Sequence, residues 1–274
     1  MMGNTNNILL EKLERGQQVY GTCITATGPL WPAATARAGL DFVFIDTEHI
    51  PLSRQELSAL CQSYRARGVV PIVRIPSPDP FSACQALDGG AQGIVMPYVE
   101  SVGQLTELVA AVKYRPLKGE LLQDYLAGRR EMPGPLRDYI RSFNAPNLCI
   151  ANIESVPALE RLEELLAVAG LDAVFIGPHD LSVSLGLPEQ YDHPEFEKAV
   201  RTIIHACRAR GIHVGIHFSL EPSRQVQWIR EGANMVVHSF DIALFTQRLC
   251  QDMDFIKKAA GDQPGDSAPG SLVV

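Results

Sequence analysis

Short apolar runs alternate with amphipathic segments along most of this chain. Eight apolar runs rich in Val, Ile and Phe are predicted to be strands, at residues 19–26, 42–47, 70–75, 93–98, 148–153, 173–176, 213–218 and 234–237. Helical periodicity fills the intervals between them, at residues 54–67, 102–113, 157–169, 194–210 and 221–231. Regular alternation of strand and helix is typical of β/α units in a parallel sheet.

The predicted strands are nearly continuous apolar runs, which is typical of parallel strands buried on both faces. Glycine stands just before several strands, where it would end the preceding helix; these residues are Gly39, Gly68, Gly170, Gly211 and Gly232. Eight such units favour a closed (β/α)8 barrel of the TIM type over an open doubly wound sheet. The absence of a GxGxxG motif after the first strand argues further against a Rossmann fold.

We therefore expect a single α/β domain, the (β/α)8 barrel, over residues 19–260, preceded by an N-terminal extension or helix over residues 1–18. Residues 114–147 are predicted to be one long irregular connection between the fourth and fifth strands, and connections of that length are usually functional or disordered. The tail at residues 261–274 is rich in Gly, Pro and Ser and is predicted to be disordered.

Composition and charge argue against several classes of partner and location for this protein. A net charge of −7 argues against a nucleic-acid or anionic-membrane partner but is compatible with a small anionic substrate. The N-terminus lacks the basic and apolar regions of a secretory signal, and no apolar stretch approaches the roughly 20 residues that span a bilayer. The six cysteines are widely spaced without a CxxC pair, so we expect reduced thiols in a cytoplasmic protein.

Polar side chains gather at the ends of the predicted strands, where a barrel places its active site. The residues at these ends are Asp46, Glu48, His49, Arg74, Glu154, His179, Asp180, His217 and His238. Four of the seven histidines are among them. A barrel without a functional site does not require acidic residues, an arginine and histidines on one rim.

Glu154 and Asp180 follow neighbouring predicted strands. Two carboxylates with room for water and a chelating substrate suit an octahedral, hard divalent ion. The alternative is that both serve as helix caps or ion-pair partners, with Asp180 capping the segment that begins at Leu181.

Arg74 ends a buried strand and, because a guanidinium keeps its charge, needs an anionic partner. It either stabilises a developing enolate oxygen or pairs with a buried acid. His49 lies close to Asp46 and Glu48 and is a candidate base, although an isolated histidine is more often structural. None of the six lysines falls in a predicted strand or at its carboxyl end, so a carbonyl substrate on this scaffold would be activated by a metal and not by an imine.

The motifs FIDTEH, VRIP, MPYVES, NIES and FIGPHDLS occur in this order. In these motifs the chain resembles the family of 4-hydroxy-2-oxoheptanedioate aldolase and 2-dehydro-3-deoxyglucarate aldolase, which are class II pyruvate aldolases of the phosphoenolpyruvate/pyruvate barrel superfamily. The resemblance covers residues 19–249. It implies metal-dependent, reversible retro-aldol cleavage of a 4-hydroxy-2-oxo acid to pyruvate, or a related 2-oxo acid, and an aldehyde.

The resemblance also implies roles for single residues. It places the metal ligands at Glu154 and Asp180, the enolate-stabilising arginine at Arg74, and a catalytic pair at His49 and Asp88. Residues implied in substrate binding are Arg74, Asn152, Gly177, Pro178 and His179. The implied metal is Mg²⁺, Mn²⁺ or Co²⁺, and the implied assembly is a homo-oligomer, a hexamer or trimer of dimers, with a swapped C-terminal helix.

The chain departs from the family pattern near the second substrate. Asn152 stands where the family usually has Gln, residues 114–147 lack its Pro-Pro-x-Gly-x-Arg-Gly stretch, and His217 and His238 replace small residues. We expect His179, His217 and His238 to contact the second substrate, unless the last two are structural. Two other functions stay open: a decarboxylase or other lyase of an oxaloacetate-like acid acting through the same enolate, and a barrel without catalytic activity.

Asp88 follows the helical stretch 80–87, just before the fourth strand. Barrel topology puts the end of that helix on the opposite side from His49. We expect Asp88 to reach His49 of a neighbouring subunit, the alternative being that it caps its own helix.

Overall fold

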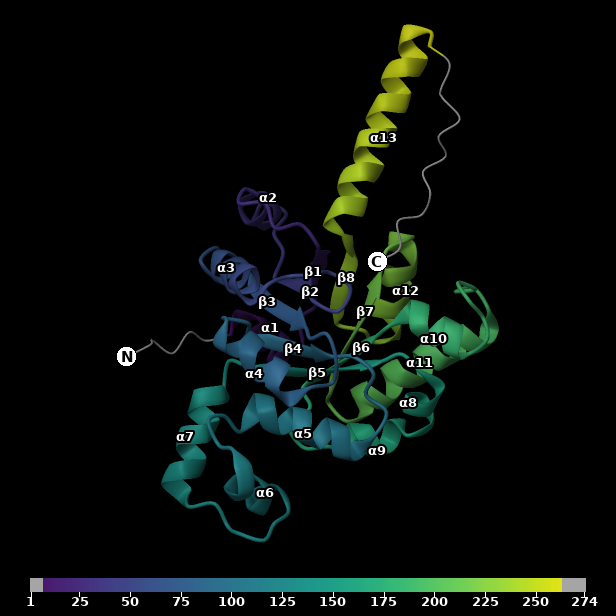
Figure 1. The fold of residues 1–274 in the computed structure, drawn as a ribbon. Helices are drawn as coiled ribbons and strands as arrows, with labels where there is room; N and C mark the ends of the chain where they lie inside the picture. The colour runs from purple at the N-terminus through teal and green to yellow at the C-terminus, as the bar shows by residue number, and fades with distance from the viewer. Residues whose placement is uncertain (1–6, 263–274) are drawn as a thin grey trace.

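A closed barrel of eight parallel strands forms the centre of the computed structural model, which describes residues 7–262 (Figure 1). The strands are β1 (Val19–Ile24), β2 (Phe42–Asp46), β3 (Val70–Arg74), β4 (Gly93–Met96), β5 (Leu148–Ile153), β6 (Ala173–Ile176), β7 (His213–Phe218) and β8 (Met235–Phe240). Each strand pairs with the next, and β8 closes the barrel on β1. The predicted (β/α)8 fold is confirmed.

Helices surround the barrel and connect its strands (Figure 1). They are α1 (Ile8–Glu14), α2 (Trp31–Ala36), α3 (Arg54–Arg65), α4 (Pro80–Asp88), α5 (Val102–Lys113), α6 (Gly119–Leu126), α7 (Gly134–Asn144), α8 (Val156–Glu160), α9 (Leu162–Leu166), α10 (Pro178–Ser184), α11 (Pro194–Ala209), α12 (Pro222–Glu231) and α13 (Asp241–Ala260). The glycines predicted to end helices have left-handed backbones, from φ 72° at Gly39 to 121° at Gly232, which only glycine adopts without strain.

Two sequence predictions about the connections are wrong. Residues 114–147 are not irregular, because they contain α6 and α7. Residues 157–169 do not form one helix but the two short helices α8 and α9, which meet at Arg161. The tail predicted to be disordered lies almost wholly outside the described residues, as do the first six residues of the N-terminal extension.

The alternation of side chains along each strand positions the site. One hydrophobic cluster fills the inside of the barrel, where the ring of Phe175 lies 6.4 Å from that of Phe42 and 5.9 Å from that of Phe44. A larger cluster lies between the strands and the helices. On β2 the inward face runs from Phe42 through Phe44 to Asp46, so the apolar interior ends in polar side chains at the carboxyl end.

The C-terminal helix α13 does not pack along the barrel but extends away from it (Figure 1). It carries several exposed large apolar side chains, which are Ile242, Phe245, Leu249, Met253, Phe255 and Ile256. Within residues 7–262, no helix combines the length and apolar character that a bilayer span needs.

Candidate active site

Asp46 and Arg74 form a buried ion pair at the carboxyl ends of β2 and β3, where they are register partners. Arg74 donates from Nε and Nη2 to the two carboxylate oxygens of Asp46 at 2.9 and 2.8 Å. Burial works against ionisation of Asp46, but the hydrogen bonds and charge of Arg74 hold its pKa below the ordinary value. Asp46 therefore positions the guanidinium. This two-point contact between Arg74 and Asp46 leaves Nη1 of Arg74 available to a ligand.

Glu48 lies beside the same guanidinium. Its Oε2 is 3.1 Å from Nε of Arg74, whose single hydrogen already bonds to Asp46. This oxygen is buried, and no described residue donates a hydrogen bond to it. Nε2 of His49 lies 3.9 Å away. A hydrogen bond to Glu48 also raises the pKa of Tyr98 to about 12. Glu48 thus keeps an unused acceptor beside the candidate base.

Glu154 follows β5, and its carboxylate is held from two sides. The backbone N–H of Tyr98 donates to Oε1 at 2.8 Å, and the side-chain amide of Asn152 donates to Oε2. The side chain is only 5% exposed. Burial, together with the charges of Asp180 and Glu48, raises the pKa of Glu154 to about 7. Negative charge at this point is incompletely neutralised by the protein.

Gly177 and Asp180 begin α10 beside Glu154. Gly177 is the N-cap and Asp180 lies in the first turn, so Asp180 is not the helix cap that the alternative required. A side chain at 177 has no room, because a Cβ there would lie 2.7 Å from Oε2 of Glu154 and 3.2 Å from Nδ2 of Asn152. Asp180 is exposed at the barrel mouth. The turn brings its backbone close to the buried carboxylate while leaving the Asp180 side chain accessible.

A cavity of about 720 Å³ opens at this end of the barrel. Most of the predicted site residues line it, namely His49, Arg74, Asn152, Gly177, Pro178, His179, Asp180 and His217. Among the described residues, no lysine does. The structure therefore brings these residues, from five separate strand ends, into one space, with Glu154 behind Gly177.

Two predicted residues lie elsewhere. His238 alternates on β8 with Val237, which is part of the barrel interior, so the His238 side chain faces the helix layer and does not line the cavity. Asp88 ends α4 at the opposite side of the barrel from His49, and its carboxylate pairs with Arg115 of the same chain. As expected from topology, the structure does not bring Asp88 to His49 within one subunit.

Tyr98 was not predicted as a site residue. It follows β4 with a left-handed backbone, φ 53°, which is unusual outside glycine. This conformation accompanies the hydrogen bond from its N–H to Glu154. The MPYVES motif directly after the fourth strand was the available signal, but a backbone contact is invisible in a sequence.

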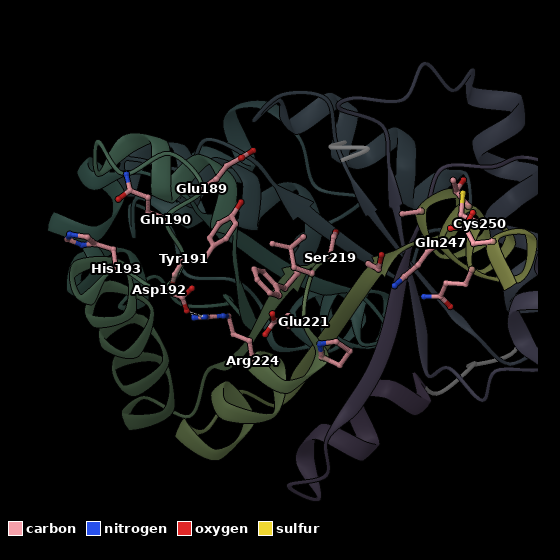
Figure 2. A pocket seen from close by; sticks show the side chains of 18 of the residues that line it. Glu189, Gln190, Tyr191, Asp192, His193, Ser219, Glu221, Arg224, Gln247 and Cys250 are labelled. Atoms are coloured by element: carbon pink, nitrogen blue, oxygen red, sulfur yellow. Dashed lines mark hydrogen bonds and ion pairs between the residues drawn. The ribbon is translucent and has the colours of Figure 1, made fainter. Parts of the chain in front are cut away.

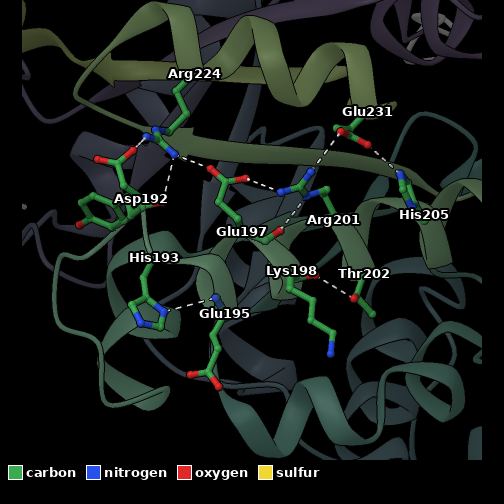
Figure 3. A network of polar contacts seen from close by, with 11 residues as sticks. Asp192, His193, Glu195, Glu197, Lys198, Arg201, Thr202, His205, Arg224 and Glu231 are labelled. Atoms are coloured by element: carbon green, nitrogen blue, oxygen red, sulfur yellow. Dashed lines mark hydrogen bonds and ion pairs between the residues drawn. The ribbon is translucent and has the colours of Figure 1, made fainter.

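Tyr191 was also missed, and its place at the cavity depends on Arg224. The Tyr191 ring lies edge-on to Phe218, with centroids 5.4 Å apart. Arg224 donates to the Tyr191 carbonyl at 3.0 Å and pairs with Asp192 and Glu197 (Figure 3). The contacts to Tyr191 and Asp192 join α12 to a connection more than thirty residues earlier, so local sequence gives no indication of them.

A second cavity of about 1250 Å³ adjoins the first (Figure 2). It lies between the connections that follow α10 and β7, represented by Glu189 and Ser219, and residues of α13 such as Gln247 and Cys250. Its walls therefore come from the barrel mouth and from the helix that extends away from the barrel.

The fit of a metal ion rests on the carboxylates. The described residues hold no group of three or more His, Cys, Asp or Glu placed around one ion. Glu154 and Asp180 supply two carboxylates, and the raised pKa of Glu154 reflects negative charge that a cation would neutralise. Mg²⁺ is commonly held by one or two carboxylates, with water and substrate completing its shell. The residues fit such an ion, and the buried Oε2 of Glu48 is an acceptor nearby.

Comparison with known proteins gives a consistent picture. The profile of the HpcH/HpaI aldolase/citrate lyase family matches residues 24–247. The chain is 32% identical over 252 residues to the 2-keto-3-deoxy-L-rhamnonate aldolase of Escherichia coli K12, covering 92% of this chain and 94% of that protein.

Solved structures show the same likeness. An HpcH/HpaI aldolase from Desulfitobacterium hafniense superposes with a TM-score of 0.80 at 29% identity, covering 95% of this chain and 99% of the other. The citrate synthase SbnG is also similar, with a TM-score of 0.80 at 28% identity over 93% of this chain and 99% of the other.

Replacement of Glu154 by Gln should stabilise the metal-free protein. The pKa of Glu154 rises from 4.5 to about 7 on folding, so above pH 7 the native state holds an ionised group that it disfavours. The neutral amide avoids this cost, with its oxygen accepting from the Tyr98 N–H and its nitrogen donating to a flipped Asn152 amide. We expect a gain of about 1–3 kcal/mol, or a few degrees in Tm, in EDTA at pH 8. The gain should shrink as the pH falls below 7 and disappear below pH 4.5, where the wild-type carboxyl is protonated in both states. A variant that melts below the wild type at pH 8 would contradict this.

Proposed function

The chain belongs to the HpcH/HpaI aldolase/citrate lyase family, and from that premise we infer that it is a carbon–carbon lyase that cleaves a 4-hydroxy-2-oxo acid reversibly. The products are pyruvate, or a related 2-oxo acid, and an aldehyde. The two-point ion pair between Asp46 and Arg74 is the observation that supports this function most strongly. It fixes a cation at the cavity, beside the Glu154 and Asp180 carboxylates. A permanent, oriented cation at this point suits the negative charge that develops on an enolate oxygen.

The cleavage step divides between His49 and Arg74. His49, directly or through a water, takes the proton of the C4 hydroxyl. The C3–C4 bond then breaks, C4 leaves as the aldehyde, and the electron pair of the bond becomes the enolate of pyruvate. Arg74 stabilises the enolate oxygen, and protonation of C3 gives the methyl group. Oε2 of Glu48 lies 3.9 Å from Nε2 of His49, beside the candidate base.

Glu154 and Asp180 are the residues that would hold a divalent ion, Mg²⁺, Mn²⁺ or Co²⁺. When bound, such an ion supplies Lewis-acid polarisation of the 2-oxo group. Asn152 orients the Glu154 carboxylate, and Gly177 leaves the space that it occupies. The backbone from Gly177 to His179 binds the pyruvate carboxylate.

Metal dependence is the first test. We expect pyruvate release from a 4-hydroxy-2-oxo acid to stop in excess EDTA and to return with Mg²⁺, Mn²⁺ or Co²⁺, and to be more efficient than CO₂ release from oxaloacetate. Glu154→Gln and Asp180→Asn should abolish turnover and weaken divalent-ion binding measured by calorimetry. Glu163→Gln, at an exposed carboxylate that pairs with Arg210, is the control and should behave as wild type. Full activity in EDTA would exclude the metal-dependent mechanism.

Arg74→Lys tests the guanidinium. Lysine keeps the charge but loses the planar fork that Asp46 holds, and we expect kcat to fall at least ~100-fold, the scale of losing one oxyanion donor. Arg54→Lys, at an exposed position in α3, controls for the exchange itself. Near-normal turnover of a folded Arg74→Lys protein would show that Arg74 is only structural.

The assembly is a homo-oligomer, a hexamer or trimer of dimers, in which α13 packs on a neighbouring subunit. Support comes from the exposed apolar side chains of α13 and from the large cavity between it and its own barrel (Figures 1 and 2). Asp88, which is 71% exposed and far along the chain from His49, pairs with His49 of a neighbour in this assembly.

Mixing two inactive variants tests the shared site. His49→Ala and Asp88→Ala should each be inactive, but after subunit exchange some interfaces carry both intact side chains. If subunits assort at random, roughly one quarter of the sites should regain activity. Arg115→Ala is the control. If Asp88 acted only within its own subunit, through its ion pair with Arg115, loss of Arg115 should reproduce the defect of Asp88→Ala. A mixture that stays inactive despite demonstrated exchange would exclude the pairing.

A further inference from the structure

His217 points into the barrel at the level of Arg74. Two residues earlier on the inward face of β7, Gly215 leaves no room for a side chain, because a Cβ would lie 2.5 Å from the Met235 carbonyl oxygen. The first space on this face opens at His217. Its ring lies 5.5 Å from the Phe44 ring, and the Arg74 guanidinium lies 5.4 Å from the same ring. His217 therefore stands at the floor of the cavity, close to the enolate-stabilising cation.

One hydrogen bond fixes which nitrogen of His217 carries the proton. Nε2 lies 3.1 Å from the carbonyl oxygen of Ser239, and a carbonyl only accepts. Nε2 is therefore the donor. Burial and the charge of Arg74 lower the pKa of His217 to about 4, which keeps the ring neutral near pH 7. Nδ1 is then an unprotonated acceptor, and the hydrogen bond that the ring makes to the described residues is the one from Nε2 to Ser239.

The backbone of Ser239 is held in a strained conformation behind this contact. Its φ is 52°, in the left-handed region that side chains rarely adopt. The strain accompanies a carbonyl turned towards the His217 ring. Local strain of this kind is usually found where a group must be oriented for function.

The charges around the cavity restrict what can approach Nδ1. Among the described residues that line it, Arg74 is the only permanent cation, and Asp46 and Glu48 already surround it. Asp180 and Glu189 add negative charge at the mouth. An aldehyde that carries a carboxylate would place its negative charge beside acidic residues and beside a ring nitrogen that only accepts. An aldehyde that carries a hydroxyl could donate a hydrogen bond to that nitrogen.

Resting on the aldolase function above, we propose that His217 is a specificity-determining residue whose Nδ1 accepts a hydrogen bond from a hydroxyl group of the aldehyde substrate. The enzyme thereby selects neutral hydroxyaldehydes over unsubstituted and carboxylated aldehydes. In the addition direction, the new bond joins the pyruvate methyl carbon to the aldehyde carbon, whose oxygen takes a proton. The selected hydroxyl is not consumed. An aldehyde without the hydroxyl would cover this acceptor on binding and leave it unpaired, which is the physical basis of strong discrimination.

Competition between isosteric aldehydes tests the proposal. Pyruvate and Mg²⁺ or Mn²⁺ are offered with equal amounts of glycolaldehyde and propionaldehyde, which differ only by a hydroxyl in place of a methyl group, and with succinic semialdehyde as the carboxylated competitor. The product ratio measured by mass gives the ratio of kcat/KM. We expect the wild type to prefer glycolaldehyde at least ~10-fold, about 1.4 kcal/mol.

The variants separate the two ring nitrogens. His217→Leu removes both, and His217→Gln keeps a donor near Nε2 for the Ser239 carbonyl but loses the acceptor at Nδ1. Both should lower the glycolaldehyde preference ~10-fold, to near unity. His217→Asn keeps a polar group at the Nδ1 position and should retain a substantial preference. His238→Leu is the matched control, because this histidine of the adjoining strand does not line the cavity, and its ratio should equal that of wild type.

The outcomes distinguish this inference from the proposed function. An unchanged ratio in folded His217→Leu and His217→Gln, or an equal collapse in His238→Leu, overturns the role of His217. A wild type that exchanges the methyl protons of pyruvate with deuterated water but prefers propionaldehyde or succinic semialdehyde also overturns it, while leaving the aldolase function intact. No exchange and no product with any aldehyde would remove the proposed function, and this inference with it.

Discussion

The buried pair of Asp46 and Arg74 is the interaction on which the rest of the site depends. Removing one partner of such a pair leaves an uncompensated buried charge, at a cost of about 3–5 kcal/mol. The two-point contact fixes the plane of the guanidinium as well as its charge. Asp46 also accepts from the backbone N–H of Glu48 at 3.0 Å. One carboxylate therefore orients both the cation and the turn that carries His49.

Backbone strain is found at residues that line the site or hydrogen-bond to its side chains. The non-glycine residues with left-handed backbones in the described chain are Tyr98, Glu189 and Ser239, with φ of 53°, 58° and 52°. Each such residue costs roughly 1–3 kcal/mol and persists because surrounding contacts over-determine it. Tyr98 directs its N–H to Glu154, and Ser239 directs its carbonyl to His217. The closed apolar barrel supplies the rigidity that holds these conformations beside acids that repel one another.

The fold was largely predictable because its signals are local. Strands buried on both faces need continuous apolar runs, and three of the eight predicted strands have the observed bounds, at residues 148–153, 173–176 and 213–218. Left-handed helix ends need glycine, and all five predicted positions show it. Prediction failed at 114–147, where α6 has no buried residue and α7 has only two. The helical spacing of Leu136, Tyr139, Ile140 and Phe143 in α7 was a local signal that the prediction missed.

The sequence by itself determined which residues stand at the strand ends, because parallel strands in a barrel must direct those ends to one rim. It therefore located Arg74, Glu154 and Asp180. Only the tertiary structure decided which groups these residues contact. Arg74 donates hydrogen bonds to Asp46, and the backbone N–H of Tyr98, after β4, donates to Glu154. The tertiary structure also separated His217, inside the barrel, from His238, outside it. These choices depend on register and on contacts between distant segments, which no local pattern encodes.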